Sequence, residues 1–311
     1  MLPTFDLQGH RGARGLKPEN TLPSFEAAFD AGVTSVETDL HLTRDGVVVL
    51  WHDPRLGGAP WHPAEESRAV SGLSLKELRR YRADRNLDPA RFPDQDAAVT
   101  PLVRLFAEEH GLDPYALPTL TDLFRFAEAY AGEMGARAGK TGARRAAAGR
   151  VRFDLELKRL PFFPETINDG YGGRAPGLLE RRVVEAVQEA GVAGRTTVRS
   201  FDHRCVCLLR EMEPRLTGAL LVAGTAPLDP AELVRRAGAR IYCPRYDFLD
   251  EDLVRRAHDG GALVLPWTVN EPAHWDRLLD WGVDGLTTDF PDRLARFLET
   301  WREGREAVRL A

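Results

Sequence analysis

Short apolar runs alternate with longer amphipathic segments along almost the whole chain. The short runs have the length of buried strands, whereas the longer segments repeat apolar residues at helical spacing. Strands are predicted at 4–8, 34–40, 151–157, 196–200, 217–222, 240–243, 263–269 and 284–288. Helices are predicted at 23–31, 119–130, 178–190, 203–213, 230–237, 250–259, 272–281 and 292–302. Strands that alternate with helices form a parallel sheet, and eight such units predict an α/β fold, the TIM (β/α)8 barrel.

One further apolar run, Gly46–Trp51, is interpreted as an extension of the second strand. The alternative to a barrel is an open doubly wound sheet, which usually has fewer strands. No Gly-x-Gly-x-x-Gly motif follows the first strand, so the sequence does not support a dinucleotide-binding fold.

Two segments interrupt the alternation. Pro54–Pro118 is too long for a simple connection and contains one helical stretch, Ser74–Arg82. We expect it to be a small subdomain, inserted after the second strand of a single domain spanning 1–311 and lying over one face of the barrel. Gly132–Arg150 is rich in Gly and Ala and has five basic residues. A solvated flexible loop is expected there, with a phosphate or membrane contact as the alternative.

Composition narrows the class of protein and its partners. Hydrophobic residues make up 43% and charged residues 29% of the chain, as in globular proteins. No stretch approaches the roughly 20 apolar residues of a membrane span, so no stable membrane insertion is expected. The net charge of −5 is unlike that of a nucleic-acid binder, and the partner is expected to be a small molecule. The sequence does not indicate an oligomeric state.

The N-terminus and the cysteines bear on the compartment. The first residues have neither the basic nor the apolar region of a signal peptide, so a cytoplasmic location is expected if Met1 is the true start. A processed exported form is the alternative. The three cysteines, Cys205, Cys207 and Cys243, make neither a disulfide framework nor a zinc pattern.

Acidic residues end two neighbouring predicted strands. Glu37 and Asp39 lie two apart on one strand and therefore point to the same face, and Glu156 ends the next strand. The C-terminal ends of barrel strands meet at one mouth, where these carboxylates can converge. Carboxylates without nearby cysteine suit one hard divalent cation, Mg²⁺ or Ca²⁺, with Mn²⁺ as a further candidate. Lys158, on the same face as Glu156, then suits a phosphate contact.

Two histidines are predicted at the same mouth. His10 and Arg11 follow the first strand, and His52 follows the extension of the second. Paired histidines beside a metal suit general acid–base catalysis near neutral pH, and Arg11 can bind phosphate oxygens through two N–H groups. The remaining histidines have no such context and are interpreted as surface or structural residues: His41, His62, His110, His203, His258 and His274.

With these residues the chain resembles the glycerophosphodiester phosphodiesterase family. His10-Arg11-Gly12 through Pro18-Glu19-Asn20-Thr21 is similar to that family's opening motif, and Glu37-x-Asp39 followed by His52-Asp53 is similar to the rest of its signature. Leu155-Glu156-Leu157-Lys158 resembles the segment that provides a third metal ligand and a lysine. The resemblance implies that the three carboxylates bind the metal and that the two histidines are catalytic.

The resemblance continues to the C-terminus, at 117–120, 200–202, 267–270 and 282–291. It implies a TIM barrel that hydrolyses glycerophosphodiesters to glycerol 3-phosphate and an alcohol. Two roles stay open within it. Glu19 belongs either to a turn or beside the site, where it would support Arg11 or substrate. Trp267 is either barrel packing or an apolar wall against the glycerol carbons.

Two loops depart from the family pattern and leave alternatives for the substrate. Gly132–Arg150 and Arg159–Pro176 are longer than usual and flank the strand of Glu156, which leaves the substrate specificity open but not the core chemistry. A relative that acts on a lysophospholipid or sphingolipid headgroup is one alternative, with Phe162 and Phe163 as candidates for a membrane-facing rim. A non-catalytic phosphodiester-binding protein is another, although the presence of both histidines and all three ligands argues against it.

Overall fold

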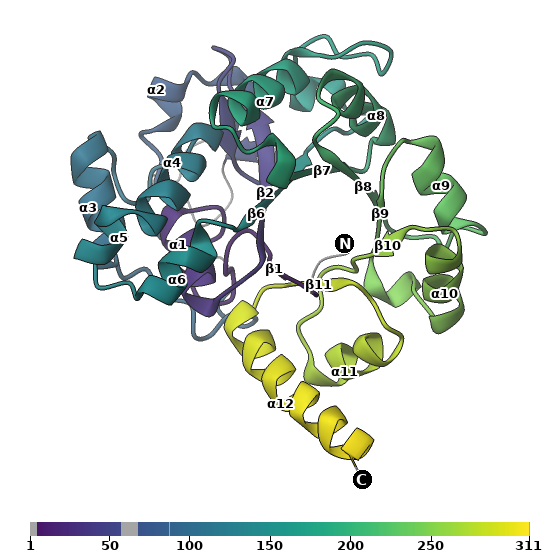
Figure 1. The fold of residues 1–311 in the computed structure, drawn as a ribbon. Helices are drawn as coiled ribbons and strands as arrows, with labels where there is room; N and C mark the ends of the chain where they lie inside the picture. Colours follow the sequence, from purple (N-terminus) through teal and green to yellow (C-terminus); the bar gives the residue numbers. More distant parts are fainter. Residues whose placement is uncertain (1–4, 57–67, 87, 311) are drawn as a thin grey trace.

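The computed structural model describes residues 5–56, 68–86 and 88–310, and its centre is a ring of parallel strands (Figure 1). The strands follow one another round the ring as β1 (Asp6–Gly9), β2 (Ser35–Leu42), β6 (Arg152–Leu157), β7 (Thr196–Ser200), β8 (Thr217–Val222), β9 (Ile241–Pro244), β10 (Leu263–Val264) and β11 (Gly285–Thr288). β1 pairs with β11, and the backbone N–H of Asp284, next to β11, donates to the backbone oxygen of Val264 in β10 at 3.0 Å. The predicted barrel is confirmed.

Helices surround this ring, as Figure 1 shows. Those that follow the barrel strands are α1 (Leu22–Ala31), α4 (Leu120–Ala131), α7 (Leu178–Glu189), α8 (His203–Met212), α9 (Pro230–Arg236), α10 (Glu251–Asp259), α11 (Pro272–Asp280) and α12 (Pro291–Leu310). The N-cap of α1 is Thr21, whose side chain accepts a hydrogen bond from the backbone N–H of Ser24. Its C-cap is Gly32, in the left-handed conformation (φ 79°). Both boundaries match the pattern of the sequence.

The interpretation of Gly46–Trp51 as an extension of the second strand is wrong. Val48–Leu50 forms a separate strand, β3, which pairs antiparallel with β2, so that Leu50 lies opposite Leu40. An Asp45-Gly46 turn joins the two strands, with Gly46 at φ 76°. Hydrophobicity alone does not distinguish a continuing strand from a returning one. The hairpin brings the chain after Leu50 back to the mouth of the barrel.

The long insertion has two parts. The first comprises β4 (Arg55–Leu56), β5 (Arg68–Ala69) and α2 (Leu75–Leu78). These elements pack with β3 in a small hydrophobic cluster that is separate from the main core. The predicted helix Ser74–Arg82 is shorter in the structure, where it ends at Leu78. The second part is α3 (Pro101–His110), a helix that was not predicted from the sequence. It joins the main core through Leu102, Val103 and Phe106. Residues 57–67 of the insertion lie outside the described residues.

Gly132–Arg150 is not the flexible loop that its composition predicted. It forms α5 (Glu133–Arg137) and α6 (Gly142–Ala148), and Lys140 makes ion pairs with Glu26 and Asp30 of α1 at 2.6 and 2.7 Å. Alanine is a strong helix former, and its abundance in this segment favours the two helices. Because the segment leads into the start of β6, it lies at the barrel end opposite the mouth.

Candidate active site

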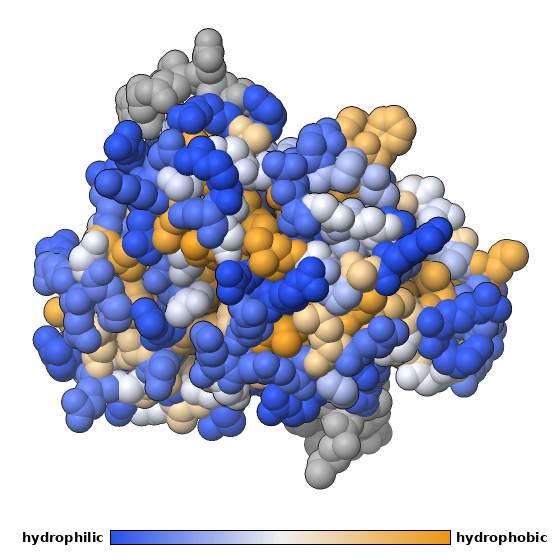
Figure 2. Space-filling model, turned by 90° about the horizontal axis from the view of Figure 1, so that it is seen from above, coloured by the Kyte–Doolittle hydropathy of each residue, from blue (hydrophilic) through white to orange (hydrophobic). Residues whose placement is uncertain are grey.

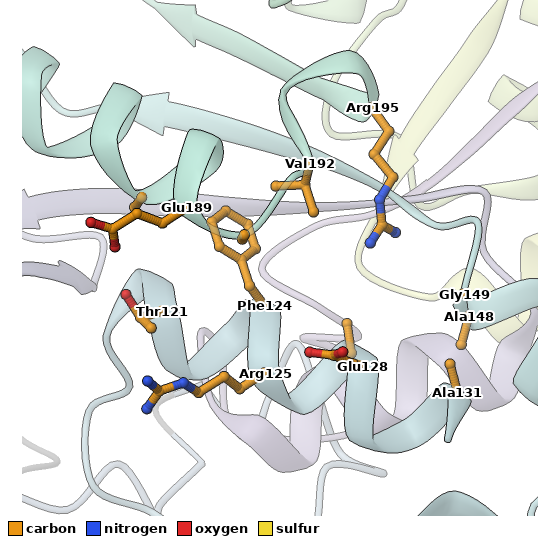
Figure 3. Close-up of a pocket in the computed structure, with 13 residues that line it drawn as sticks. Thr121, Phe124, Arg125, Glu128, Ala131, Ala148, Gly149, Glu189, Val192 and Arg195 are labelled. Carbon is orange, nitrogen blue, oxygen red and sulfur yellow. The ribbon is translucent and has the colours of Figure 1, made fainter. Parts of the chain in front are cut away.

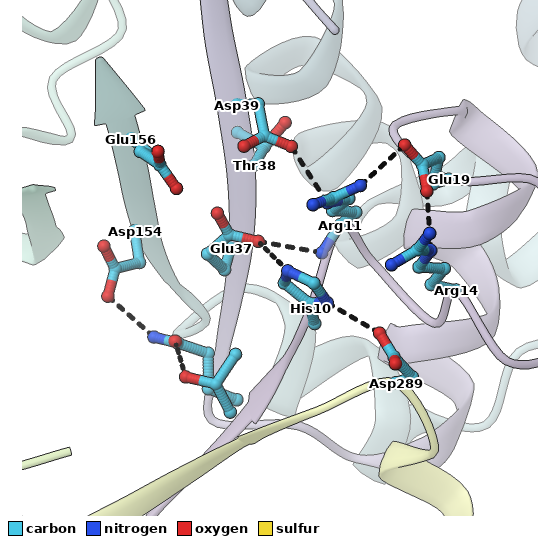
Figure 4. Close-up of polar contacts among 12 residues, drawn as sticks. His10, Arg11, Arg14, Glu19, Glu37, Thr38, Asp39, Asp154, Glu156 and Asp289 are labelled. Atoms are coloured by element: carbon cyan, nitrogen blue, oxygen red, sulfur yellow. Dashed lines mark hydrogen bonds and ion pairs between the residues drawn. The ribbon is translucent and has the colours of Figure 1, made fainter. Parts of the chain in front are cut away.

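Three carboxylates come together at the mouth, where the ends of β2 and β6 lie side by side (Figure 4). Asp39 and Glu156 are opposite one another in the strand register, and Glu37 precedes Asp39 on the same face. One oxygen of each side chain lies within 4.8 Å of the others. All three residues are buried. The predicted ligand set is thus assembled at one point.

Burial and neighbouring charges shift the pKa values of two carboxyl groups in this cluster. Burial, followed by the neighbouring charge of Asp39, raises the pKa of Glu37 well above its usual range. Burial also acts to raise the pKa of Asp39, but the charges of Arg11 and then Lys158 hold it well below its usual value. The adjacent cations therefore favour the ionised form of Asp39.

Two protein cations lie directly against the carboxylates. Lys158 Nζ lies 2.6 Å from Glu156 Oε1 and 3.3 Å from Asp39 Oδ1. Arg11 Nε lies 3.1 Å from Asp39 Oδ2, but it makes no hydrogen bond despite being buried. These contacts partly neutralise the cluster and leave Asp39 Oδ1 without a hydrogen-bond donor. A buried acidic cluster with an oxygen that accepts no hydrogen bond is a chemically suitable site for a hard cation.

His10 follows β1 and lies between two acidic groups, as Figure 4 shows. Its Nδ1 is 2.6 Å from Asp289 Oδ1, and its Nε2 is 3.9 Å from Glu37 Oε2. The next backbone N–H, that of Arg11, donates to the same Glu37 oxygen at 2.9 Å. Arg11 and Gly12 have φ values of 51° and 85°, and a Cβ at position 12 would meet Ser24. The left-handed turn thus holds His10 over the carboxylates.

Arg11 is held by carboxylates on two sides. Its Nη1 donates to Glu19 Oε1 at 2.8 Å, opposite the contact with Asp39 described above. Glu19 also pairs with Arg14 at 2.6 Å. Glu19 therefore lies where it supports Arg11, which was one of the two roles left open for it. Next to it, Asn20 (φ 56°) donates its amide to Asp39 Oδ2 at 2.9 Å.

His52 reaches the mouth through the β3 hairpin. Its side chain is 34% exposed, and its Nδ1 lies 2.7 Å from Asp53 Oδ1. The backbone oxygen of His52 accepts a hydrogen bond of 3.2 Å from the ring of His41. His41 is buried, and burial lowers its pKa to about 4, so that it stays neutral and acts as a structural residue.

A cavity of about 460 Å³ joins these groups. Its lining residues are His10, Arg11, Arg14, Glu37, His52, Arg91, Glu156, Lys158, Arg199, Phe201, Leu221, Arg245, Tyr246, Trp267, Thr268 and Thr287. Trp267 contributes an aromatic wall, since its ring lies 5.6 Å from that of Phe201 and its Nε1 donates to the Cys243 backbone oxygen. The cavity thus brings both histidines, Lys158 and two of the carboxylates to a common space.

Comparison with known proteins decides the family. The model of the glycerophosphoryl diester phosphodiesterase family matches residues 10–293. This chain belongs to that family. Its members are enzymes, so the protein is a phosphodiesterase, and the alternative of a non-catalytic binding protein is set aside.

The relatives of this phosphodiesterase cover nearly its whole length. It is 26% identical over 292 residues to a glycerophosphodiester phosphodiesterase of Bacillus altitudinis, covering 93% of this chain and 96% of the relative. A structure from Silicibacter pomeroyi, a candidate glycerophosphoryl diester phosphodiesterase, is 28% identical, with a TM-score of 0.76 and coverage of 96% and 94%. A phosphodiesterase of Oleispira antarctica, solved with its product sn-glycerol-3-phosphate, is 20% identical, with a TM-score of 0.66 and coverage of 96% and 97%; it shares the fold.

Several residues of the phosphodiesterase site were missed in the sequence. Asp289 follows β11, and the rule used for His10 and His52, a polar residue after a strand end, also applies to it. Arg91 belongs to the insertion, where no periodic signal exists. Arg199 lies within β7 and is 2.5–2.6 Å from Asp154 beneath the carboxylates. A charged residue inside a buried strand was the available signal for it.

Outside the mouth cavity, the described residues present fewer groups suited to catalysis. A second cavity of about 380 Å³ lies on the outer wall between α4, α6 and α7 (Figure 3). Its described lining combines small residues with isolated charged groups and includes no histidine. The described histidines other than His10 and His52 are absent from the lining of the mouth cavity, and His62 lies outside the described residues. No helix in the described part of the chain has the length and apolar character needed to cross a membrane.

Proposed function

We propose that this phosphodiesterase hydrolyses small glycerophosphodiesters to glycerol 3-phosphate and an alcohol, with a divalent cation held by Glu37, Asp39 and Glu156. The observation that carries the proposal is that these buried carboxylates form one cluster beside a cavity, which two of them and both histidines line. The product complex of the Oleispira antarctica enzyme supports the choice of substrate class.

The donor set favours Mg²⁺ or Ca²⁺, with Mn²⁺ as a further candidate. All three ligands are carboxylates, the donors that hard cations prefer. When bound, the cation would neutralise phosphate charge and lower the pKa of a hydroxyl that attacks phosphorus. Lys158 and Arg11 balance only part of the negative charge of the three carboxylates, and the excess that remains favours a cationic occupant.

The protein's own groups would bind phosphate and move protons. Lys158 lines the cavity and can bind a phosphate oxygen in place of Glu156. Arg11 lines the cavity as well, and it would contribute charge while Glu19 holds its guanidinium. His10 and His52 would serve as acid and base, and each has a carboxylate at Nδ1 that leaves Nε2 for the substrate.

A pair of histidines suits a mechanism in which a hydroxyl of the substrate itself is the nucleophile. One would take the proton of the glycerol hydroxyl next to the ester as its oxygen attacks phosphorus, and the other would protonate the departing alcohol. Water would then open the cyclic phosphate, with the two histidines in exchanged roles. An internal hydroxyl gains from proximity, with effective molarities of about 10⁵–10⁸ M in favourable systems. Direct attack by water is the alternative route.

The test compares glycerophosphocholine with its 2-deoxy analogue at saturation, together with a phosphorus-NMR search for the cyclic species. Much slower turnover of the deoxy substrate is expected. Equal turnover of the two substrates would eliminate the internal hydroxyl and leave water as the nucleophile. The same assay on diesters of choline, ethanolamine, glycerol and inositol, read as free glycerol 3-phosphate, would define the alcohol that the cavity accepts.

One observation favours a lipid-headgroup diester as a second candidate substrate. The large hydrophobic side chains that are exposed among the described residues are Leu160, Phe162, Phe163, Phe201 and Leu228. All of them follow β6, β7 or β8 and therefore lie on the mouth side. Figure 2, which shows the molecule from above, shows groups of hydrophobic side chains that project at the edge of a largely hydrophilic surface.

Such a rim would place the cavity at a lipid surface. The test is co-sedimentation with phosphatidylcholine vesicles that contain lysophospholipid, using Phe162→Ser as the comparison. Binding that the substitution weakens, together with release of the lysolipid headgroup, would support this candidate. Absence of vesicle binding would leave the small glycerophosphodiesters as the substrates.

A further inference from the structure

Asp289 is a buried carboxylate that contacts one of the two histidines. It follows β11, is 0% exposed, and its Oδ1 lies 2.6 Å from His10 Nδ1. Its Oδ2 accepts the amide of Asn270 at 2.7 Å and pairs with Arg91 at 3.2 Å. Figure 4 shows the His10 ring between Asp289 on one side and Glu37 on the other. Each oxygen of this carboxylate therefore has a defined partner.

We propose that Asp289 is the positioning residue for His10 and that Arg91, from the insertion, holds Asp289 in place. The inference rests on the proposed function, since it assigns His10 a proton-transfer role. A carboxylate at Nδ1 makes that nitrogen the donor and leaves Nε2 free to exchange a proton. Here Nε2 is the nitrogen that lies toward Glu37, in a residue that lines the cavity.

The surroundings of Asp289 fix its orientation. Asn270 not only donates to its Oδ2 but also accepts from its backbone N–H at 2.9 Å and from the Thr288 hydroxyl at 3.1 Å. The backbone oxygen of Asp289 accepts from Gly15 at 2.7 Å. A carboxylate held at its side chain and its backbone can impose one ring orientation and one tautomer on His10.

Arg91 connects this arrangement to the insertion. The guanidinium of Arg91 lies 5.2 Å from the centre of the Phe92 ring, and that ring is 5.9 Å from Phe290, the residue after Asp289. Arg14 lies over the same Phe92 ring at 4.9 Å. The insertion is thus packed against the strand end that carries Asp289. On this account it completes the environment of His10 as well as bordering the substrate.

The experiment is a double-mutant cycle on kcat. Asp289→Asn keeps the size of the side chain but weakens its acceptor, and it should lower kcat by about 10²-fold while KM changes little. In a His10→Ala background the same substitution should have no further effect, because its influence passes through the ring. A merely structural role would lower activity in both backgrounds.

Arg91→Gln, an exposed change that leaves the buried network intact, provides a second test. It should lower kcat by about tenfold, and again only when His10 is present. The matched control is Arg44→Gln, which removes another exposed ion pair to the insertion, with Glu77 at 2.8 Å, at a residue absent from the cavity lining; its activity should equal wild type.

The outcomes separate the two claims. If His10→Ala keeps wild-type turnover, the proposed function of His10 fails. If His10→Ala is impaired but Asp289→Asn and Arg91→Gln are fully active, or lower activity equally without His10, the positioning role is overturned. Thermal unfolding and metal-binding measurements on each variant identify any loss of folding, and Arg91→Gln then decides the case if Asp289→Asn does not fold.

Discussion

His10 and His52 each have a carboxylate at Nδ1, yet their surroundings differ. The side chain of His10 is 12% exposed and its partner Asp289 is fully buried, whereas His52 is 34% exposed and its partner Asp53 62% exposed. A buried pair is screened less by solvent than an exposed one. Substitution of Asp289 should consequently affect turnover more than substitution of Asp53.

The first prediction concerns the two rings themselves. His10→Ala and His52→Ala should each lower turnover by about 10²–10⁴-fold, because each removes an acid–base group, while metal binding persists. Steady-state kinetics and calorimetric titration with Mn²⁺ measure the two properties. His110→Ala, a change on the outer wall in α3, is the control and should be fully active. A histidine variant with near-normal turnover would show that its ring is structural.

At the residue scale, the sequence predicted the positions of those candidate residues that lie at the end of a single strand. Glu37, Asp39 and Glu156 could be aligned from spacing along strands, and the structure assembles them. The pair His10–Asp289 spans 279 positions and depends on the closure of the ring by β1 and β11. Local spacing contains no information about that contact. Arg91 was missed because its segment has no regular secondary structure to set a register.

At the scale of elements, the loop 159–176 is anchored by one buried arginine. Arg159 donates to Asp169 and to Glu180 of α7, with the closest contacts at 2.7 Å, and its guanidinium lies 4.0 Å from the Tyr171 ring centre. The loop leaves the barrel directly after Lys158, so this anchor sets its course beside the cavity.

The second prediction concerns this anchor and its pH dependence. Burial acts to raise the pKa of Asp169, but the hydrogen bonds from Arg159 and the Leu179 N–H outweigh it and lower the pKa. The folded state thus binds fewer protons than the unfolded one. The stabilisation is present above the unfolded pKa of about 3.9 and is lost as pH falls through the lower folded value.

Asp169→Asn should therefore lower the free energy of unfolding by about 3 kcal/mol at pH 7, as expected for a broken buried ion pair. The difference from wild type should shrink below about pH 4. Urea unfolding at pH 7, 5 and 3 measures it. Glu185→Gln, which breaks an exposed ion pair on α7, should change stability by less than about 0.5 kcal/mol. A difference for Asp169→Asn that is equal at all three pH values would refute the assignment.

Element types were predicted better than their pairing and their ends. The Asp45-Gly46 turn was a hairpin signal, but the apolar run after it was read by hydrophobicity alone. In the same way, the composition of Gly132–Arg150 obscured two helices that are stabilised by packing and by Lys140. In both cases a local signal was present in the sequence, Asp-Gly for a tight turn and alanine for a helix.

At the scale of the whole molecule, α3 makes the insertion part of the barrel. Phe106 is fully buried and meets Phe126 of α4 edge to face, with ring centres 5.2 Å apart. The alternation of strands and helices was enough to predict the barrel, because each unit repeats the same pattern. The insertion has no such repeat, and only the packed core shows where it joins the wall.

The third prediction follows from that packing. Phe106→Ala should lower the free energy of unfolding by about 3–5 kcal/mol and leave a single unfolding transition, because the insertion shares the main core. Phe162→Ala, at a side chain 86% exposed, should change stability by less than about 0.5 kcal/mol. Denaturant unfolding followed by circular dichroism measures both. A separate early transition in Phe106→Ala with an unchanged main one would mean that the insertion folds independently.

The central claim is that the carboxylate cluster acts through a divalent cation. Its most direct test is the release of glycerol 3-phosphate from glycerophosphoethanolamine by protein treated with chelator and then supplied with Mg²⁺, Mn²⁺ or Ca²⁺. Glu37→Gln and Glu156→Gln are assayed beside the control Glu185→Gln. The account predicts no release in chelator, recovery to different degrees with the three ions, and loss of metal affinity and most turnover only in the two ligand variants. Undiminished release in excess chelator, or full activity of either ligand variant, would contradict it.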